Sequence, residues 1–209
     1  ELNELKSRYV SMAAHDLRNP MALILTSADT LEAYWSRLSE EKRQDKFAQI
    51  KNSIKVMTDI LNDVLVMGQA DSGKLEFSPS FMNVTEFCQT IILETTQIMG
   101  NAIGIEFSVE GVNGLVRMDA KLLRHILTNL FSNALKYSIS GGRVIFKVCK
   151  VAEQVIFHIQ DQGIGIPKSE QVHIFETFHR ASNARHVHGT GLGLAIVKRS
   201  VDLHGGTIT

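Results

Sequence analysis

The first side chain with the chemistry of a nucleophile is His15, a histidine within a helical pattern near the start of the chain. Asp16 follows directly, so a carboxylate can accept a hydrogen bond from one ring nitrogen and leave the other nitrogen as the nucleophile. Asn19 lies four residues after His15 and therefore shares its helical face. Pro20 cannot donate a backbone hydrogen bond, so the helix can bend there. The alternative is a surface histidine beside a helix kink, and this hexapeptide alone favours function only modestly.

A second polar pattern, Asn129-Leu-Phe-Ser-Asn133-Ala-Leu-Lys136-Tyr137, places four polar side chains at helical spacing. Asn133 lies four residues after Asn129, and Lys136 and Tyr137 follow three and four residues later, so all four share one helical face. Amide oxygens suit a hard cation such as Mg²⁺, a lysine supplies a charge for phosphate, and a tyrosine ring can cover a sugar or a base. The alternative is a polar helix face in contact with solvent.

Two glycine-containing loops have features that suit a phosphorylated ligand. Asp161-Gln-Gly163-Ile-Gly165-Ile166-Pro167 follows a predicted strand, where a carboxylate can accept a hydrogen bond from an exocyclic amine such as that of adenine. The second loop leads into a helix, whose N-terminal amides form an anion site, and it consists of Gly189, Thr190, Gly191, Leu192 and Gly193. It is neither a P-loop, because no Gly-Lys-Ser/Thr follows, nor a dinucleotide-binding turn, because it does not follow a first strand. Each loop alone is a weak signal.

Two long helices are predicted to carry the first motif. Apolar residues recur at spacings of three and four from Leu2 to Trp35, with Pro20 as the one interruption. A polar stretch at 39–45 is expected to break this helix, and a second apolar stripe runs from Phe47 to Gly68. The two helices form an antiparallel hairpin whose stripes are too wide for one partner helix to cover. Dimerisation into a four-helix bundle would bury them.

The remainder of the chain is expected to be mixed α/β. Asp71-Ser72-Gly73 ends the helical pair, and Pro79 marks a linker. Helices are predicted at 84–99, at 120–137 with Asp119 as the N-cap, and at 194–203. Strands are predicted at 105–109, 115–118, 144–148 and 155–159. Gly205-Gly206 stops the last helix, and residues 207–209 look like the first residues of a further strand.

The composition excludes several classes of function. Lys plus Arg and Asp plus Glu number 22 each, so the chain attracts no polyanion and nucleic-acid binding is not expected. No apolar run approaches the length of a membrane span, and no signal peptide opens the chain. We therefore expect a cytoplasmic segment without membrane contact, although upstream segments could tether the full-length protein. Cys88 and Cys149 stand alone in apolar surroundings and are expected to be buried free thiols in a reducing compartment.

The order and spacing of these motifs resemble those of the sensor histidine kinases of two-component signalling, over essentially the whole chain. In that family the motifs at 15–20, 129–137, 161–167 and 189–194 are called the H, N, G1 and G2 boxes, and residues 174–180 look like the F box. The resemblance implies a dimerisation and phosphoacceptor hairpin at 1–73 and a linker at 74–83. It implies an ATP-binding α/β sandwich of the gyrase type at 84–209, with its C-terminal strand truncated.

By motif position, the resemblance implies a protein-histidine kinase that phosphorylates its own His15 with ATP and passes the phosphoryl group to an aspartate of a response regulator. Asp16 would be the activating base, and Asn19 would position water for phosphatase action on that regulator. Asn133 would hold Mg²⁺, and residues 181–193 would form a mobile lid. The implied ATP-binding residues are Asn129, Asn133, Lys136, Tyr137, Asp161, Gly163, Gly165, Ile166, Arg180, Gly189, Thr190, Gly191, Leu192 and Gly193.

The chain departs from the family's usual pattern within the H box. The family often carries Glu and Thr where this chain has Asp16 and Asn19, which preserve an acceptor and a small polar group. The implied lid also carries His186 and His188 beside His179, but a transition-metal site there is a minor alternative because histidines two apart on a mobile loop are usually solvated. Four other histidines are interpreted as structural or surface residues: His125, His158, His173 and His204.

Two rival functions stay open at this point. A non-catalytic dimeric scaffold could bind nucleotide and a partner without transfer, but the intact set of motif residues argues against it. A serine kinase or ATPase could share the nucleotide-binding fold, but such families lack a histidine on a dimerising hairpin. The sequence does not identify the sensed signal or the response regulator, and it does not decide between transfer within and between subunits.

Overall fold

The computed structural model describes residues 2–99, 104–138, 142–184 and 189–209. The chain divides into two compact units, one spanning Glu1–Leu75 and the other Glu76–Thr209. Each unit has its own secondary structure and its own interior, and the units are treated separately below. No helix among the described residues is long and apolar enough to cross a membrane.

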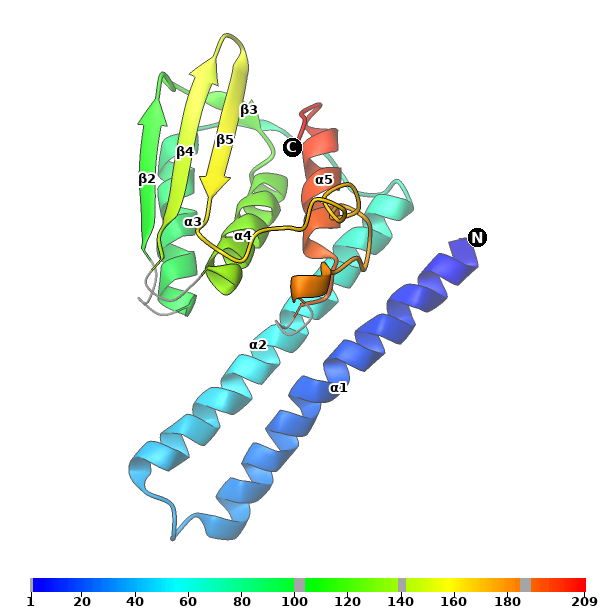
Figure 1. Ribbon diagram of the computed structural model, residues 1–209, viewed down its shortest axis with the longest axis vertical. Coiled ribbons are helices and arrows are strands. Elements are labelled where there is room, and N and C mark those ends of the chain that lie inside the picture. The colour runs from blue at the N-terminus through cyan, green and yellow to red at the C-terminus, as the bar shows by residue number, and fades with distance from the viewer. Residues whose placement is uncertain (1, 100–103, 139–141, 185–188) are drawn as a thin grey trace. The chain divides into compact units, whose positions relative to one another are not determined.

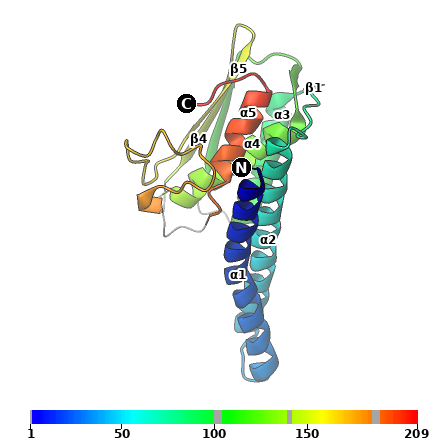
Figure 2. The same ribbon diagram turned by 90° about the vertical axis from the view of Figure 1, so that its right-hand side faces the viewer.

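The first unit is an antiparallel pair of long helices, α1 at Leu2–Tyr34 and α2 at Glu40–Asp71 (Figure 1, Figure 2). The predicted break at 39–45 is too long, because α2 already begins at Glu40. Ser39 is its N-cap and accepts a hydrogen bond from the Lys42 amide at 3.4 Å, so the polar residues after it form the first helical turns. The turn is closed by the Trp35 ring, which contacts the Phe47 ring edge-on at 6.3 Å and lies beneath the Arg43 guanidinium.

The hairpin buries only part of its apolar surface. Its interior includes Leu31, Ile60 and Met67 and also two serines, of which Ser27 donates a hydrogen bond to the Gln49 side chain at 3.1 Å. Large apolar side chains that remain exposed include Met21, Leu23, Leu25, Ile54, Leu61 and Leu65. Exposed apolar side chains in this number on a helix pair make the hairpin a candidate interaction surface.

The second unit is mixed α/β, as predicted. Its helices are α3 at Val84–Met99, α4 at Ala120–Tyr137 and α5 at Gly193–Leu203, and a short 3₁₀ turn lies at Ser182–Ala184. Its strands are β1 at Ser80–Met82, β2 at Ile105–Glu110, β3 at Val116–Met118, β4 at Val144–Val151 and β5 at Gln154–Gln160. All predicted helices of this unit are confirmed, with ends within one residue of the predicted ones.

The strands form two sheets. β2, β4 and β5 form a three-stranded sheet in the order β2-β4-β5, with β2 parallel and β5 antiparallel to β4, whereas β1 pairs with β3 in an antiparallel ribbon. β1 lies within the stretch that is predicted to be a linker. The sequence does not predict this strand, because three residues are too few for an alternating pattern to be recognised. Residues 207–209 form no strand with the described residues, so that prediction is not confirmed.

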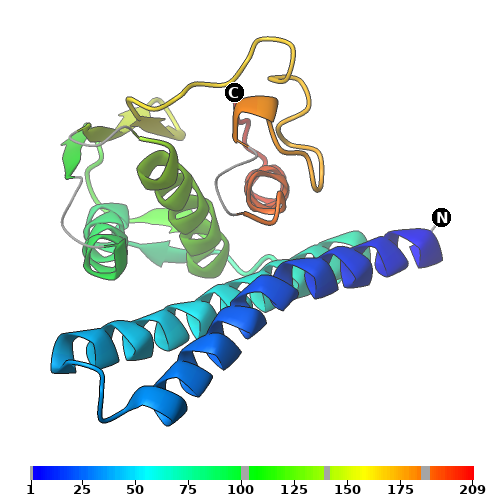
Figure 3. The ribbon, with the colours of Figure 1, turned by 60° about the horizontal axis from the view of Figure 1, so that its bottom comes forward.

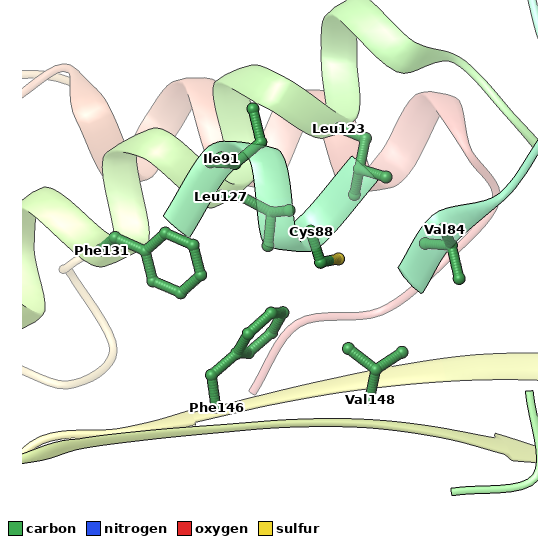
Figure 4. Packing of buried hydrophobic residues seen from close by; sticks show 8 residues of the cluster. All are labelled: Val84, Cys88, Ile91, Leu123, Leu127, Phe131, Phe146 and Val148. Atoms are coloured by element: carbon green, nitrogen blue, oxygen red, sulfur yellow. The ribbon is translucent and has the colours of Figure 1, made fainter. Parts of the chain in front are cut away.

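Helices α3 and α4 lie side by side on one face of the three-stranded sheet, and α5 packs beside α4 (Figure 3). The core between them is formed by Val84, Cys88, Ile91, Leu123, Leu127, Phe131, Phe146 and Val148 (Figure 4). Phe146 of β4 is central, since its ring packs against those of Phe131 at 5.0 Å and Phe107 at 5.1 Å. This packing fixes one face of α4 and leaves its polar side chains outside the core.

The two cysteines differ in burial. Cys88 is fully buried, and burial raises the pKa of its thiol to about 12, so it is an inert core residue. Cys149 is only half-buried on β4, so the prediction of a buried thiol is wrong at this position. It follows Val148 on the strand, and successive side chains point to opposite faces, so Cys149 lies on the face away from the core.

Asp119 begins α4 as its N-cap and is almost completely buried. Its carboxylate accepts hydrogen bonds from the amides of Ser78 at 2.7 Å, Lys121 at 2.9 Å and Leu122 at 3.1 Å. Burial opposes the charge, but the hydrogen bonds from these three amides outweigh it and hold the pKa of the Asp119 carboxyl below its ordinary value. The charge is thereby stabilised inside the fold.

We expect Asp119→Ala to lower the free energy of unfolding of the second unit by about 2 kcal/mol at pH 7, because an N-cap and a charge-assisted bond are both lost. A carboxyl with a depressed pKa in the folded state stabilises above its unfolded pKa of about 4, and this contribution is lost as the pH falls through the folded pKa. The difference in the free energy of unfolding between Asp119→Ala and wild type should therefore shrink below about pH 4. Urea unfolding at several pH values measures this.

The matched control is Asp202→Ala, which removes an exposed carboxylate paired with Lys198 on α5. It should cost less than about 0.5 kcal/mol. Equal stability of Asp119→Ala and wild type at pH 7, or a difference that does not vary with pH, would contradict the role assigned to the buried carboxylate.

Candidate active site

Helix α4 presents the N box at the side of the core. Leu123, Leu127 and Phe131 are buried against the sheet, whereas Asn129, Asn133 and Tyr137 are half-buried and Lys136 is exposed. The Asn129 side chain is oriented by its amide nitrogen, which donates to the His125 carbonyl at 2.9 Å. Its amide oxygen therefore points away from that bond. The predicted polar face exists and is open at its C-terminal half.

The G2 loop meets α4 at Gly193, the first residue of α5. A Cβ atom on Gly193 would lie 2.5 Å from the Asn129 side-chain oxygen, so a larger residue there would require the Asn129 side chain or the start of α5 to shift. Within the loop, Thr190 accepts a hydrogen bond from the Leu192 amide at 3.2 Å, and Leu192 is buried. The start of α5, with its N-terminal amides, is thus held beside the N box.

The G1 loop meets α4 at its C-terminal end. A Cβ atom on Gly163 would lie 2.4 Å from the Tyr137 carbonyl oxygen, and the Ile164 amide donates to the same oxygen at 3.3 Å. The exposed Asp161 accepts a hydrogen bond from the Gly163 amide at 2.8 Å through one carboxylate oxygen. The loop after β5 is therefore attached to the end of the N box, with Asp161 close to that junction.

The stretch between the two loops is organised by a carboxylate that sequence reasoning missed, Glu170. It accepts a hydrogen bond from the Ser182 amide at 3.2 Å and pairs with the His179 ring at 2.9 Å. The hydrogen bonds from the Ser182 side chain and backbone, with a smaller contribution from His179, hold the pKa of Glu170 below its ordinary value. The sequence spacing of Glu170, His179 and Ser182 matches neither a helix nor a strand, because an irregular loop brings these residues together. The contacts could therefore not be predicted from the sequence.

The F box and the residues that follow it are bonded to the two glycine loops. The Phe178 amide donates to the Gly191 carbonyl at 2.9 Å, and Phe178 adopts a φ of 66°, which is unusual for a residue with a side chain. The Asn183 side chain donates to the Gly165 carbonyl at 3.0 Å. Arg180 is half-buried, and its guanidinium donates to the Ala184 carbonyl at 3.2 Å. The base of the predicted lid is therefore an ordered extension of the site.

The site residues of the first unit lie on α1. Asp16 is half-buried, Asn19 is exposed and Pro20 is buried inside the helix, whereas the His15 side chain lies outside the described side chains. Residues 185–188 of the predicted lid, which include His186 and His188, also lie outside the described residues. Among the residues that are described, no group of three His, Cys, Asp or Glu side chains could hold a metal ion.

Comparison with protein families separates the chain in the same way. Residues 5–73 match the His Kinase A (phospho-acceptor) domain, and residues 118–209 match the histidine kinase-, DNA gyrase B-, and HSP90-like ATPase family. The circadian input-output histidine kinase CikA of Synechococcus elongatus is 31% identical over 99% of this chain, which spans 28% of that protein. The sensor histidine kinase WalK of Bacillus subtilis is 31% identical over 100% of the chain, which spans 34% of it.

The solved structures that resemble this chain are also histidine kinases. The mycobacterial sensor histidine kinase MprB is 32% identical, with a TM-score of 0.52, over 62% of this chain and 81% of that one. The histidine kinase AdeS of Acinetobacter baumannii has the same fold, with a TM-score of 0.67 at 19% identity over 90% of this chain and 86% of that one. The two domain matches, in this order along one chain, and these relatives show that the chain belongs to the sensor histidine kinases of two-component signalling and carries their phosphoacceptor and ATPase-type domains.

Proposed function

We propose that this chain transfers the γ-phosphoryl group of ATP to His15 and then to an aspartate of a response regulator. The observation that carries the proposal is the attachment of both glycine loops to α4, at Gly163 and at Gly193. This places a carboxylate, two amide side chains, a lysine and a helix N-terminus around one helix face. Groups of these kinds suit a nucleoside triphosphate with a divalent cation.

The proposed ATP site assigns a role to each group. Asp161 uses one oxygen for the Gly163 amide, which leaves the other to accept a hydrogen bond from the adenine amine. The Asn133 amide oxygen would hold Mg²⁺, which keeps several waters and needs few protein ligands. Further contacts to phosphates and ribose would come from Asn129, Lys136, Tyr137, Gly165, Ile166, Arg180, Gly189, Thr190, Gly191 and Leu192. The ion itself supplies neutralisation of the phosphate charge.

The proposed chemistry at His15 needs a neutral imidazole with one nitrogen free to attack. Asp16 adjoins it on α1 and would accept the hydrogen bond that fixes the tautomer. The attacking nitrogen forms an N–P bond as the bond between the γ-phosphorus and the bridging oxygen of ADP breaks. That N–P bond is high in energy, so phosphohistidine would donate its phosphoryl group to a carboxylate, with the new O–P bond forming as the N–P bond breaks and the imidazole leaves. Asn19, exposed on α1, would position water for phosphatase action on the regulator.

The hairpin is proposed to form a homodimer. Leu25, Leu61 and Leu65 are each at least half exposed, and a second copy of the hairpin would bury them in a four-helix bundle. ATP bound to one subunit could phosphorylate His15 of the same subunit or of the other subunit. The turn between the two helices is expected to decide which of these occurs. Mixing a His15→Gln chain with an Asn133→Ala chain distinguishes the two cases, since only transfer between chains labels the mixture.

The rival functions make different predictions about the label. A scaffold that binds nucleotide without transfer would incorporate no phosphoryl group from ATP. A serine kinase or ATPase would give either an acid-stable label or free phosphate. Neither rival explains a phosphoacceptor domain of the histidine kinase type at residues 5–73.

We expect His15→Gln to reduce incorporation of the γ-phosphoryl group by at least about a hundredfold, because glutamine has no nucleophilic nitrogen. The wild-type label should be labile in acid and stable in base, as an N–P bond requires. Affinity for a non-hydrolysable ATP analogue should stay unchanged, which separates loss of the acceptor from loss of the nucleotide. Wild-type labelling of the variant would sink the assignment of His15.

Gly193→Ala should weaken binding of an ATP analogue about tenfold, because the new Cβ atom displaces the Asn129 side chain or the start of α5. Gly104→Ala is the matched control, since a Cβ atom there meets nothing within 4 Å. Titration calorimetry with Mg²⁺ present measures both affinities. Equal affinities for the two variants would show that the contact between Asn129 and Gly193 is not part of the nucleotide site.

Leu65→Asp should raise the dissociation constant of the dimer by at least about tenfold, because a charge is placed in the proposed bundle core. Leu93→Asp is the control, since Leu93 is equally exposed, at 61% against 62%, but lies on α3 of the other unit. Sedimentation equilibrium reports the association of both variants. A dimer that is weakened by Leu93→Asp and not by Leu65→Asp would place the interface elsewhere.

A further inference from the structure

A hydrogen-bonded cluster outside the proposed ATP site lies where the chain enters the second unit. The Ser78 amide donates to one oxygen of the buried Asp119 carboxylate at 2.7 Å, and the other oxygen caps α4. The first residues of the unit, which directly follow Leu75 of the hairpin unit, are therefore bonded to the start of the N-box helix. A hydrogen bond to a buried carboxylate is stronger than one between neutral groups.

His204, at the end of α5, extends this cluster. The Asp119 amide donates to His204 Nε2 at 3.1 Å, and His204 Nδ1 lies 2.8 Å from the Ser200 carbonyl oxygen. An amide can only donate and a carbonyl can only accept, so Nε2 acts as the acceptor and Nδ1 as the donor of the ring. The Phe77 ring contacts the His204 ring edge-on, with centroids 5.0 Å apart. Phe77 and Ser78 are thus held through α5 as well as through α4.

The two helices that meet in this cluster lead to the proposed ATP site. α4 begins at Asp119 and carries Asn133 in its C-terminal half, whereas α5 begins at Gly193 in the G2 loop and ends next to His204. The helices pack against each other along their length. The cluster is therefore attached to both walls of the nucleotide site, but its members lie at the opposite ends of those helices.

We propose that His204 is a positioning residue for phosphoryl transfer, which holds Phe77 and Ser78 against α4 and α5 and so fixes the direction in which the chain leaves the ATP-binding unit. The inference rests on the proposed function, because it concerns delivery of the phosphoryl group to His15. Transfer between two units connected by a chain depends on their mutual orientation, so a loosened connection slows transfer. Nucleotide binding does not require this anchor, since its residues lie at the other ends of the helices.

Two substitutions of His204 separate its hydrogen bonds. The amide of asparagine reaches the position of Nδ1, so His204→Asn can keep the bond to the Ser200 carbonyl but cannot accept from the Asp119 amide. Glutamine is longer and reaches the position of Nε2, so His204→Gln can keep that acceptor. His158→Asn is the matched control, because His158 is exposed on β5.

For His204→Asn in the full chain we expect the rate of His15 phosphorylation at saturating ATP to fall about fivefold, the factor that one lost hydrogen bond of about 1 kcal/mol gives. The affinity for an ATP analogue should stay within about twofold of wild type, and His204→Gln should recover most of the rate. Phe77→Ala should lower the rate to a similar extent, and its combination with His204→Asn should lower it little further, because both changes remove one anchor.

Amide hydrogen exchange tests the anchor without relying on phosphorylation. Exchange at Ser78 should quicken about fivefold in His204→Asn and stay at the wild-type rate in His158→Asn. An unchanged phosphorylation rate, a matching loss of nucleotide affinity, or unchanged exchange at Ser78 would overturn the role of His204. Absence of label on His15 in the wild type would instead contradict the proposed function, and the exchange measurement would still decide whether the anchor exists.

Discussion

The attachment of two glycine loops to one helix is the constraint on which the second unit depends. Gly163 approaches the Tyr137 carbonyl and Gly193 approaches the Asn129 side chain so closely that a Cβ atom at either position would overlap its neighbour. Loops from distant parts of the chain therefore flank the polar residues of α4. The core under α4, centred on Phe146, keeps the helix from moving away from them.

The two ends of α4 have different roles: the first stabilises the fold, and the second carries the proposed ligand-binding side chains. At its start, the buried Asp119 carboxylate is satisfied by three backbone amides, so a charge is stabilised inside the fold. In its C-terminal half, the Asn133 side chain is half-buried and Lys136 is exposed, so these groups can be reached by a ligand. In the hairpin, Ser27 and Leu31 are buried, whereas Leu25, Leu61 and Leu65 are exposed.

The sequence predicts the elements well because they follow from local rules. Apolar spacing locates α1, α2 and α3, and the capping aspartate and the glycines locate the ends of α4 and α5. The polar face of α4 follows from helical spacing alone. The predicted break at 39–45 is too long because the polar residues there follow a serine cap and form the first turns of α2.

Contacts between distant residues are not predictable in this way. The bond between Asp119 and His204 joins residues 85 apart, and His204 has no periodic or motif signal that distinguishes it from a surface histidine. The pair of Glu170 and His179 forms inside an irregular loop, and β1 is too short to show alternation. Val148 and Val151 favour burial of Cys149, but the alternation along β4 places Cys149 with the exposed Lys147 on the face away from the core.

The proposed nucleotide site lies between α4 and the two glycine loops. A crystal structure of the chain with a non-hydrolysable ATP analogue and Mg²⁺ tests this most directly. The account predicts the adenine amine within hydrogen-bond distance of the Asp161 carboxylate and the ion beside the Asn133 amide oxygen. A nucleotide bound elsewhere, with the polar face of α4 empty, would contradict it.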